Sequence, residues 1–191
     1  MSFSIYTQVC YLLWILMFLV WMIGRISNKR TVKKHAFSIY IFTTVFLYLS
    51  YLILFLPYFS RTFPLQVTPQ NWVFGLFGVL LCLLGVGFAI WSRYTLGKNW
   101  SGIIVTQKEN HDLIKTGPYT IVRHPIYLGF IVAMFGFALT IGNITSYVAV
   151  VLEIVTLLMR IFIEEKLMNQ IFSNSYQVYS LRTKRLIPFV W

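Results

Sequence analysis

Apolar residues are grouped along this chain in long runs, and short polar segments separate them. Three runs reach the roughly 20 residues that a bilayer-spanning helix needs, namely Ile5–Ile23, Ala36–Phe59 and Trp72–Trp91. Two shorter runs follow, Ile126–Ile141 and Tyr147–Ile163, with only residues 142–146 between them. This spacing predicts a tight helical hairpin whose slightly short arms are tilted or partly buried. The pattern therefore predicts an all-α integral membrane protein with about five transmembrane helices and a C-terminal helical hairpin.

The polar residues are distributed unevenly between the two halves of the chain. The first two apolar runs contain no acidic, basic or histidine residue, and Gly75, Gly78, Gly85 and Ala89 in the third predict close helix packing. Residues capable of chemistry gather in two stretches, 93–127 and 160–188, on either side of the hairpin. We therefore divide the chain into a three-helix membrane region, residues 1–91, and a catalytic region, residues 92–191.

The basic residues predict an orientation. Five of them lie between the first two apolar runs, only Arg61 lies between the second and third, and they return from Arg93 onward and after the hairpin. Basic loops remain on the cytoplasmic side. We expect the N-terminus outside, and a cytoplasmic cofactor-binding region and C-terminus. The start of the chain, Met1 to Tyr6, has no Lys or Arg, so we expect no cleavable signal peptide.

Composition excludes several classes of protein. The chain is 58% hydrophobic and 11% charged, whereas soluble domains average roughly 25% charged residues. The net charge of +11 does not indicate nucleic-acid binding, because the basic residues lie beside apolar runs. Cys10 and Cys82 lie within apolar runs without metal-ligand spacing, so we expect buried thiols and no metal site.

One polar segment leads into the hairpin. Gly117-Pro118 is a turn signal, and Pro125 suits the first turn of a helix. The segment brings Arg123, His124 and two tyrosines to a helix N-terminus, where backbone N–H groups and the helix dipole favour anions. Membrane anchoring by interfacial side chains is the simpler alternative.

A second polar cluster lies at the end of the last apolar run. Arg160 and Glu164 are four residues apart, so they share a helix face and could pair. Arg160 falls within the apolar run, where an ionisable residue indicates a functional site. Glu165 fits either a cation site or a solvated helix end. Glu153, on the same face as Arg160, fits either a structural partner or a catalytic group.

Other catalytic classes lack their motifs. The chain has no nucleophile elbow, P-loop, GxGxxG or metal-ligand set. Hydrolases and nucleotide-triphosphate enzymes are therefore disfavoured.

The motifs of the C-terminal half occur in a specific order. They are Leu96-Gly97, Trp100-Ser101, His111 to Ile114, Gly117-Pro118-Tyr119, Arg123-His124-Pro125, Tyr127, Gly129, Glu164-Glu165, Tyr176, Tyr179 and Arg185 to Pro188. This set, from about Tyr94 to Pro188, resembles the isoprenylcysteine carboxyl methyltransferase family, which is related to phospholipid methyltransferases. The N-terminal half is similar only as generic spans, and the short chain resembles the prokaryotic members.

The resemblance implies a cofactor, S-adenosyl-L-methionine, and the residues that bind it. These are His111, Asp112, Leu113, Ile114, Tyr119, Arg123, His124, Pro125, Ile126, Tyr127 and Glu164. It implies that Arg160 lies at the substrate side. This chain departs from the family in its two-residue acidic run and in lacking a clear counterpart of the family's upstream glutamine, for which Gln107 is a candidate. Glu165 and Glu153 are further possible site residues.

The implied reaction is methyl transfer to a lipophilic acceptor that enters from the bilayer. An ionised carboxylate is already nucleophilic, so Arg160 would need only to position it. A phospholipid amine N-methyltransferase is the nearest alternative, with His124, Glu153 or Glu165 as its base. A sterol-type reductase, a proton- or cation-coupled transporter using Glu153, and a structural membrane scaffold are further alternatives.

Overall fold

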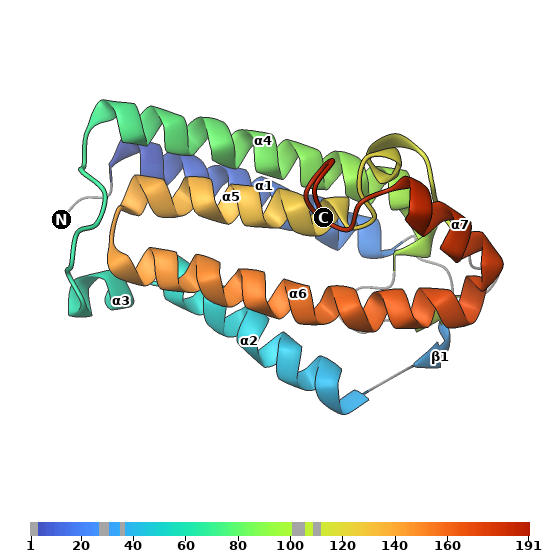
Figure 1. Cartoon of the computed structure of the whole chain (residues 1–191). Helices are drawn as coiled ribbons and strands as arrows, with labels where there is room; N and C mark the ends of the chain where they lie inside the picture. Colours follow the sequence, from blue (N-terminus) through green and yellow to red (C-terminus); the bar gives the residue numbers. More distant parts are fainter. Residues whose placement is uncertain (1–3, 27–30, 35–36, 101–105, 109–111) are drawn as a thin grey trace.

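The protein is a bundle of long helices with a small cap at one end (Figure 1). The computed structural model describes residues 4–26, 31–34, 37–100, 106–108 and 112–191. The elements are α1 (Ile5–Ile26), β1 (Thr31–Lys34), α2 (Phe37–Phe55), α3 (Pro57–Thr62), α4 (Trp72–Leu96), β2 (Thr106–Lys108), α5 (Pro125–Ile141), α6 (Ile144–Phe172) and α7 (Asn174–Arg182). Two short 3-10 turns, Gly97–Asn99 and Gly117–Thr120, precede the hairpin.

The long helices form two groups. Helix α4 packs against α5 and α1, while α2 packs against α6, and α5 joins the groups by packing on α6 (Figure 1). Helices α1, α4 and α6 are long and apolar enough to cross a membrane, and the apolar helices 41–55 and 125–141 are shorter. The protein is therefore an integral membrane protein of helical architecture, as its apolar pattern predicts.

The hairpin differs in length from the prediction. Its turn contains only Gly142, in the left-handed region with φ 70°, and Asn143, whose side chain accepts from the backbone N–H of Thr145 and caps α6. The first arm is 17 residues long, as expected, but α6 has 29 residues and ends at Phe172. The expectation of a short second arm is wrong because the helix continues beyond its apolar run through polar residues that are also good helix formers.

Helices α4 and α5 approach each other closely along glycines. A Cβ at Gly85 would lie 2.4 Å from the backbone nitrogen of Ala133, and one at Gly136 would lie 2.4 Å from that of Cys82. Gly78 and Gly129 meet the facing helix in the same way. Gly75 instead faces the ring of Tyr6 on α1. The small residues of the third apolar run therefore do pack closely, as predicted, and α4 continues unbroken past Trp91 to Leu96.

The chain also has a pair of strands that the prediction of an all-α protein did not include. Strands β1 and β2 are antiparallel, with Thr31 opposite Lys108 and Lys34 opposite Thr106. They can meet because α1 and α4 run in the same direction and end at the same end of the bundle (Figure 1). The strands that come after these two helices can consequently pair.

The glycine seam predicts a position-specific loss of stability. We expect Gly85→Ala to lower the free energy of unfolding by about 1 to 3 kcal/mol, because the new methyl group meets backbone that cannot move aside. The matched control is Gly87→Ala, two residues along the same helix, where an added Cβ meets nothing within 4 Å. Thermal unfolding in detergent would measure both, and equal stability of the two variants would contradict the packing described.

Candidate active site

The segment that enters α5 is held by the C-terminal segment of the chain. Pro125 is the first residue of α5, and the preceding backbone N–H groups of Arg123 and His124 donate to the carbonyls of Lys184 and Arg185, at 2.8 and 3.0 Å. Segments that are 60 residues apart in sequence thus form one structure. Two side chains capable of chemistry, Arg123 and His124, are fixed at the helix entrance as a result.

Glu165 connects three parts of this end of the bundle. Its two carboxylate oxygens accept from Nε of Arg123 and from Nε of Arg185, each at 2.8 Å. Arg123 also donates to the carbonyls of Ser180 and Thr183. Glu165 is only 8% exposed, so the alternative of a solvated helix end is wrong. The carboxylate is buried because two guanidinium groups compensate for its lost hydration.

The neighbouring Glu164 faces a different environment. Its carboxylate accepts from the hydroxyl of Tyr127 and lies 3.5 Å from Nδ1 of His124. The imidazole of His124 is parallel to the Tyr127 ring, and its Nε2 lies 3.6 Å from Glu165. His124 therefore stands between the two adjacent glutamates, which point in different directions from α6.

These carboxylates control the protonation of His124. Burial disfavours the imidazolium, but the neighbouring carboxylates of Glu164 and Glu165 outweigh it, so the pKa of His124 is raised above its usual value. Nearby, burial raises the pKa of Tyr119, so its hydroxyl remains protonated over the working pH range. The two carboxylates thus favour the cationic form of the ring between them.

Arg160 lies deeper in the bundle and is 4% exposed. One of its Nη atoms donates to the hydroxyl of Thr44 on α2 at 2.7 Å, and its buried Nε has no hydrogen-bond acceptor among the described residues. The suggested pairing of Arg160 with Glu164 is not found there, because Tyr127 and His124 hold that glutamate. Thr44 thus accepts one hydrogen bond from the guanidinium, and other N–H groups of Arg160 remain available as donors.

Glu153 is fully buried between α2 and α6. It accepts from the hydroxyl of Ser50 at 2.7 Å and from the hydroxyl of Tyr51 at 3.3 Å. It makes no direct ion pair with Arg160 in the described part of the chain, although the two charges interact electrostatically. Its direct partners are thus on α2.

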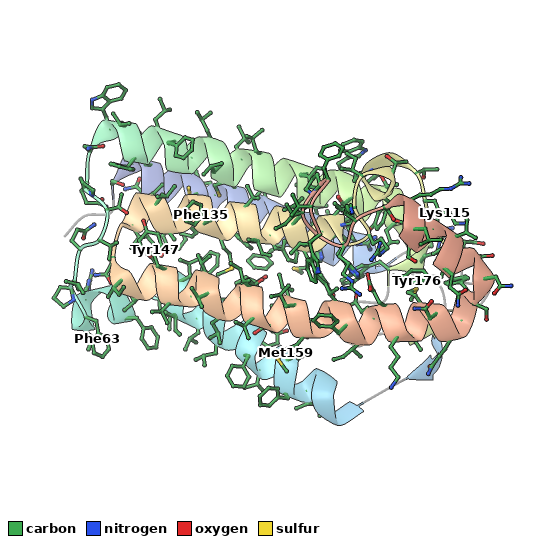
Figure 2. The ribbon with its side chains drawn as sticks, viewed as in Figure 1. Phe63, Lys115, Phe135, Tyr147, Met159 and Tyr176 are labelled. Carbon is green, nitrogen blue, oxygen red and sulfur yellow. The ribbon has the colours of Figure 1, made fainter. Side chains whose placement is uncertain are left out.

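A cavity of about 710 Å³ is lined by His124, Glu164 and Arg160 together. Its polar end is lined by Leu96, Asn99, Trp100, Asp112, Leu113, Ile114, Tyr119, Arg123, His124, Pro125, Ile126, Tyr127, Glu164, Met168, Tyr176 and Tyr179. Its apolar end is lined by Met17, Phe18, Trp21, Met22, Leu47, Tyr48, Tyr51, Phe55, Phe130 and Leu157, together with Arg160. Figure 2 shows nitrogen and oxygen atoms gathered at the end of the bundle marked by Lys115 and Tyr176.

Arg93 contacts Trp100, which lines the polar end of the cavity. Its guanidinium donates to the carbonyls of Gly24 at 2.6 Å and Gly97 at 2.8 Å, and it lies 4.6 Å from the ring centre of Trp100. This one side chain therefore connects the end of α1 to the segment that follows α4.

The structure brings together most of the residues singled out in the sequence. Residues 112–114, Tyr119, residues 123–127, Arg160 and Glu164 all line the cavity, whereas Glu165 and Glu153 are not in its wall. His111 lies outside the described residues, and Gln107 lies in β2, opposite Lys33.

Sequence analysis missed the residues that α1 and α2 contribute. Trp21, Tyr48, Tyr51 and Thr44 belong to apolar runs, and nothing in those runs distinguishes a cavity-lining position from a lipid-facing one. The aromatic and hydroxyl side chains of these runs were the only available signal. The buried role of Asn99, which accepts from the backbone N–H of Asp112, was also missed.

Comparison with known proteins gives the family. A sequence model described as phospholipid methyltransferase matches residues 73–175. The chain belongs to the phospholipid methyltransferase family. Within that match lie all of α4 after its first residue, α5, α6 and most of the polar residues of the cavity.

The similar proteins show which members of this family the chain resembles. Protein-S-isoprenylcysteine O-methyltransferase B of Arabidopsis thaliana is 29% identical over 144 residues, which are 74% of this chain and 73% of that protein. The corresponding enzyme of Saccharomyces cerevisiae is 36% identical over 115 residues, 59% of this chain and 48% of that protein. These relatives confirm the resemblance to isoprenylcysteine carboxyl methyltransferases and identify the chain, by family, as a methyltransferase.

A solved structure has the same fold. It is that of the eukaryotic intramembrane Ras methyltransferase ICMT, with a TM-score of 0.58 and 22% sequence identity. The similarity covers 83% of this chain but 55% of that one. This chain thus spans about half the length of that protein and of the yeast relative.

The position of His124 predicts a pH-dependent contribution to stability. Because its folded-state pKa is raised, the stabilisation is complete below the unfolded value of about 6.5 and is lost as pH rises through the folded value. We expect the difference in melting temperature between the wild type and His124→Gln to shrink as pH rises above about 6.5. Calorimetry in detergent would measure it, and a difference that grows with pH would contradict the raised pKa.

Proposed function

We propose that this protein is a membrane-embedded methyltransferase that uses S-adenosyl-L-methionine to methylate the carboxylate of a lipophilic, isoprenylcysteine-like acceptor. The observation that carries the proposal is the cavity, which has a polar end, an apolar end and Arg160 at the apolar side of their junction. A water-soluble cofactor and a lipid are unlike molecules, and such a cavity accommodates each in its own part.

The polar end fits the cofactor. Glu164 offers a carboxylate to a positively charged ammonium or sulfonium, and it is held by Tyr127 and His124. His124 also lines this end, with one ring nitrogen beside Glu164 and the other beside Glu165. The residues that would hold the cofactor are 112–114, Tyr119, residues 124–127 and Glu164. The family resemblance adds His111 to this set.

The proposed reaction depends on positioning and electrostatics. When bound, S-adenosyl-L-methionine supplies an electrophilic methyl group on a positively charged sulfur. Glu164 stabilises the positive charge at the polar end, while Arg160 binds the acceptor's carboxylate with the donors that Thr44 leaves available. An ionised carboxylate needs no general base, so orientation by these two groups is sufficient for an in-line displacement.

The apolar end fits the lipid part of the acceptor. Met17, Phe18, Met22 and Leu47 come from α1 and α2, whose outer faces are apolar. We propose that the acceptor enters sideways from the bilayer between these helices. By the positive-inside rule, the polar end then faces the cytoplasm and the N-terminus lies outside.

An amine acceptor is less compatible with this geometry. A protonated amine must lose its proton before it attacks, and it would meet the guanidinium of Arg160 in the cavity. His124 is held between two carboxylates, and its raised pKa favours the protonated ring, which cannot accept a further proton. Glu153 and Glu165, the other bases considered, are not in the cavity wall.

The first experiment tests the cofactor. We expect S-adenosylhomocysteine to bind the detergent-purified protein, and His124→Ala and Glu164→Gln each to weaken binding roughly tenfold or more, because each removes a charge-assisted contact. Calorimetry would measure the affinity, with Arg182→Ala, on the exposed part of α7, as control. A folded wild type that binds no S-adenosylhomocysteine would overturn the proposal.

The second experiment tests Arg160. We expect Arg160→Lys to lower kcat at least roughly tenfold with little change in cofactor affinity, because an ammonium cannot replace a bidentate guanidinium. Turnover with S-farnesylated carboxylates and calorimetry with S-adenosylhomocysteine would separate these effects. Equal losses in both would assign Arg160 a structural role instead.

A further inference from the structure

A second, smaller recess of about 220 Å³ is formed by α7 and the segment that follows it. It shares only Arg123 with the main cavity. The described residues that line it include three basic ones, Arg123, Lys184 and Arg185, and no acidic one. Val190 and Trp191 give it an apolar side. The proposed reaction uses nothing in this recess except the residue that the two cavities share.

The recess lies next to a part of α6 that faces lipid. Phe162 belongs to the apolar run of this spanning helix and is 55% exposed. The chain turns back after α7 (Figure 1), and the ring of Trp191 packs against Phe162 with the ring centres 6.2 Å apart. The guanidinium of Arg185 lies 5.3 Å from the centre of each ring. Basic and aromatic side chains thus meet where α6 leaves its apolar run, which is the depth of phospholipid headgroups.

The loop that follows α7 also exposes large apolar side chains. Phe189 is 92% exposed and Val190 is 71% exposed. The loop has a defined shape, because the backbone N–H groups of Leu186 and Ile187 both donate to the carbonyl of Trp191 at 2.8 Å. Exposed apolar side chains beside basic ones are typical of a segment that lies in the membrane interface. We therefore take the partner of this surface to be lipid.

The basic residues of the recess have donors left for a ligand. Arg185 uses Nε for its bond to Glu165, while its two Nη atoms carry further N–H groups, and its side chain is 34% exposed. The neighbouring Lys184 is exposed. A guanidinium and an ammonium side by side favour phosphate oxygens. Glu165 offsets only part of the positive charge around the recess, so a headgroup with a net negative charge fits better than a zwitterionic one.

We propose that this recess binds an anionic phospholipid from the leaflet at the polar end of the bundle. Arg185 and Lys184 bind the phosphate, and Val190 and Trp191 contact the glycerol and the upper part of the acyl chains. Clusters of basic residues next to a membrane-spanning helix attract anionic lipids in this way. The inference goes beyond the proposed function and does not depend on the identity of the methyl acceptor.

The bound lipid would also stabilise the entrance of α5. The carbonyls of Lys184 and Arg185 accept from the backbone N–H groups of Arg123 and His124. The side chain of Arg185 shares Glu165 with Arg123. A lipid that holds Lys184 and Arg185 therefore binds the folded arrangement of these segments and not the unfolded chain, so it raises the melting temperature.

The test compares two phospholipids with the same acyl chains. Protein in dodecyl maltoside micelles receives dioleoylphosphatidylglycerol or dioleoylphosphatidylcholine at equal molar ratio, and circular dichroism follows thermal unfolding. We expect the wild-type Tm to be higher with phosphatidylglycerol by roughly 3 °C or more. Lys184→Gln should lose at least about half of this difference, because it removes one of the two groups that bind the phosphate.

Arg182→Gln is the matched control. Arg182 is exposed and only two residues before Lys184, but it is not in the wall of the recess. Its loss changes the net charge by the same amount. We expect Arg182→Gln to keep nearly all of the difference between the two lipids. A general attraction between a basic protein and anionic micelles would instead make the two variants equal.

The possible results separate this inference from the proposed function. Equal Tm values of the wild type with the two lipids, or equal losses in Lys184→Gln and Arg182→Gln, would overturn the lipid site and leave the methyltransferase proposal intact. The same rise on adding inorganic phosphate to phosphatidylcholine micelles would overturn lipid as the occupant and indicate a free anion. The measurement needs neither cofactor nor methyl acceptor, so failure of the proposed function would not alter its outcome.

Discussion

The candidate site depends on the ion pairs that Glu165 makes at the end of the bundle. Its carboxylate joins α6 to Arg123 at the entrance of α5 and to Arg185 near the C-terminus. Removing it would leave two arginines without their shared counter-ion, which is far more costly than breaking an exposed ion pair. His124 and Pro125 hold their places because this connection fixes the segment before them. The geometry of the polar end of the cavity follows from one buried carboxylate.

The adjacent glutamates show how helix geometry divides structural and chemical roles. Successive residues on a helix point about 100° apart, so Glu165 turns toward the arginines while Glu164 turns toward the cavity. His124 lies close to both and so couples the framework to the site. Glu164 and Glu165 thus have different roles because they are one position apart on α6.

Much of this arrangement follows from the sequence. The apolar runs predict the long helices, Pro125 predicts the start of α5, and the order of polar motifs predicts the residues that line the polar end. The local pattern alone could not distinguish the environments of Glu165 and Glu164, since these come from segments 42, 37 and 20 residues away. The strand pair and the cavity positions on α1 and α2 depend on contacts that no local pattern records. The domain division after Trp91 and the orientation in the membrane stay predictions.

Two parts of the chain line the cavity, one before and one within the region that matches the family. The matched region begins at residue 73, whereas the apolar end of the cavity draws on α1 and α2, which precede it. On the proposed function, a lineage could therefore exchange its first two helices and acquire a new range of lipids while inheriting the proposed methyl-donor site unchanged. The first two helices of such a protein would then evolve separately from the rest of the chain. Relatives with closely similar C-terminal halves would differ in the molecules that they modify.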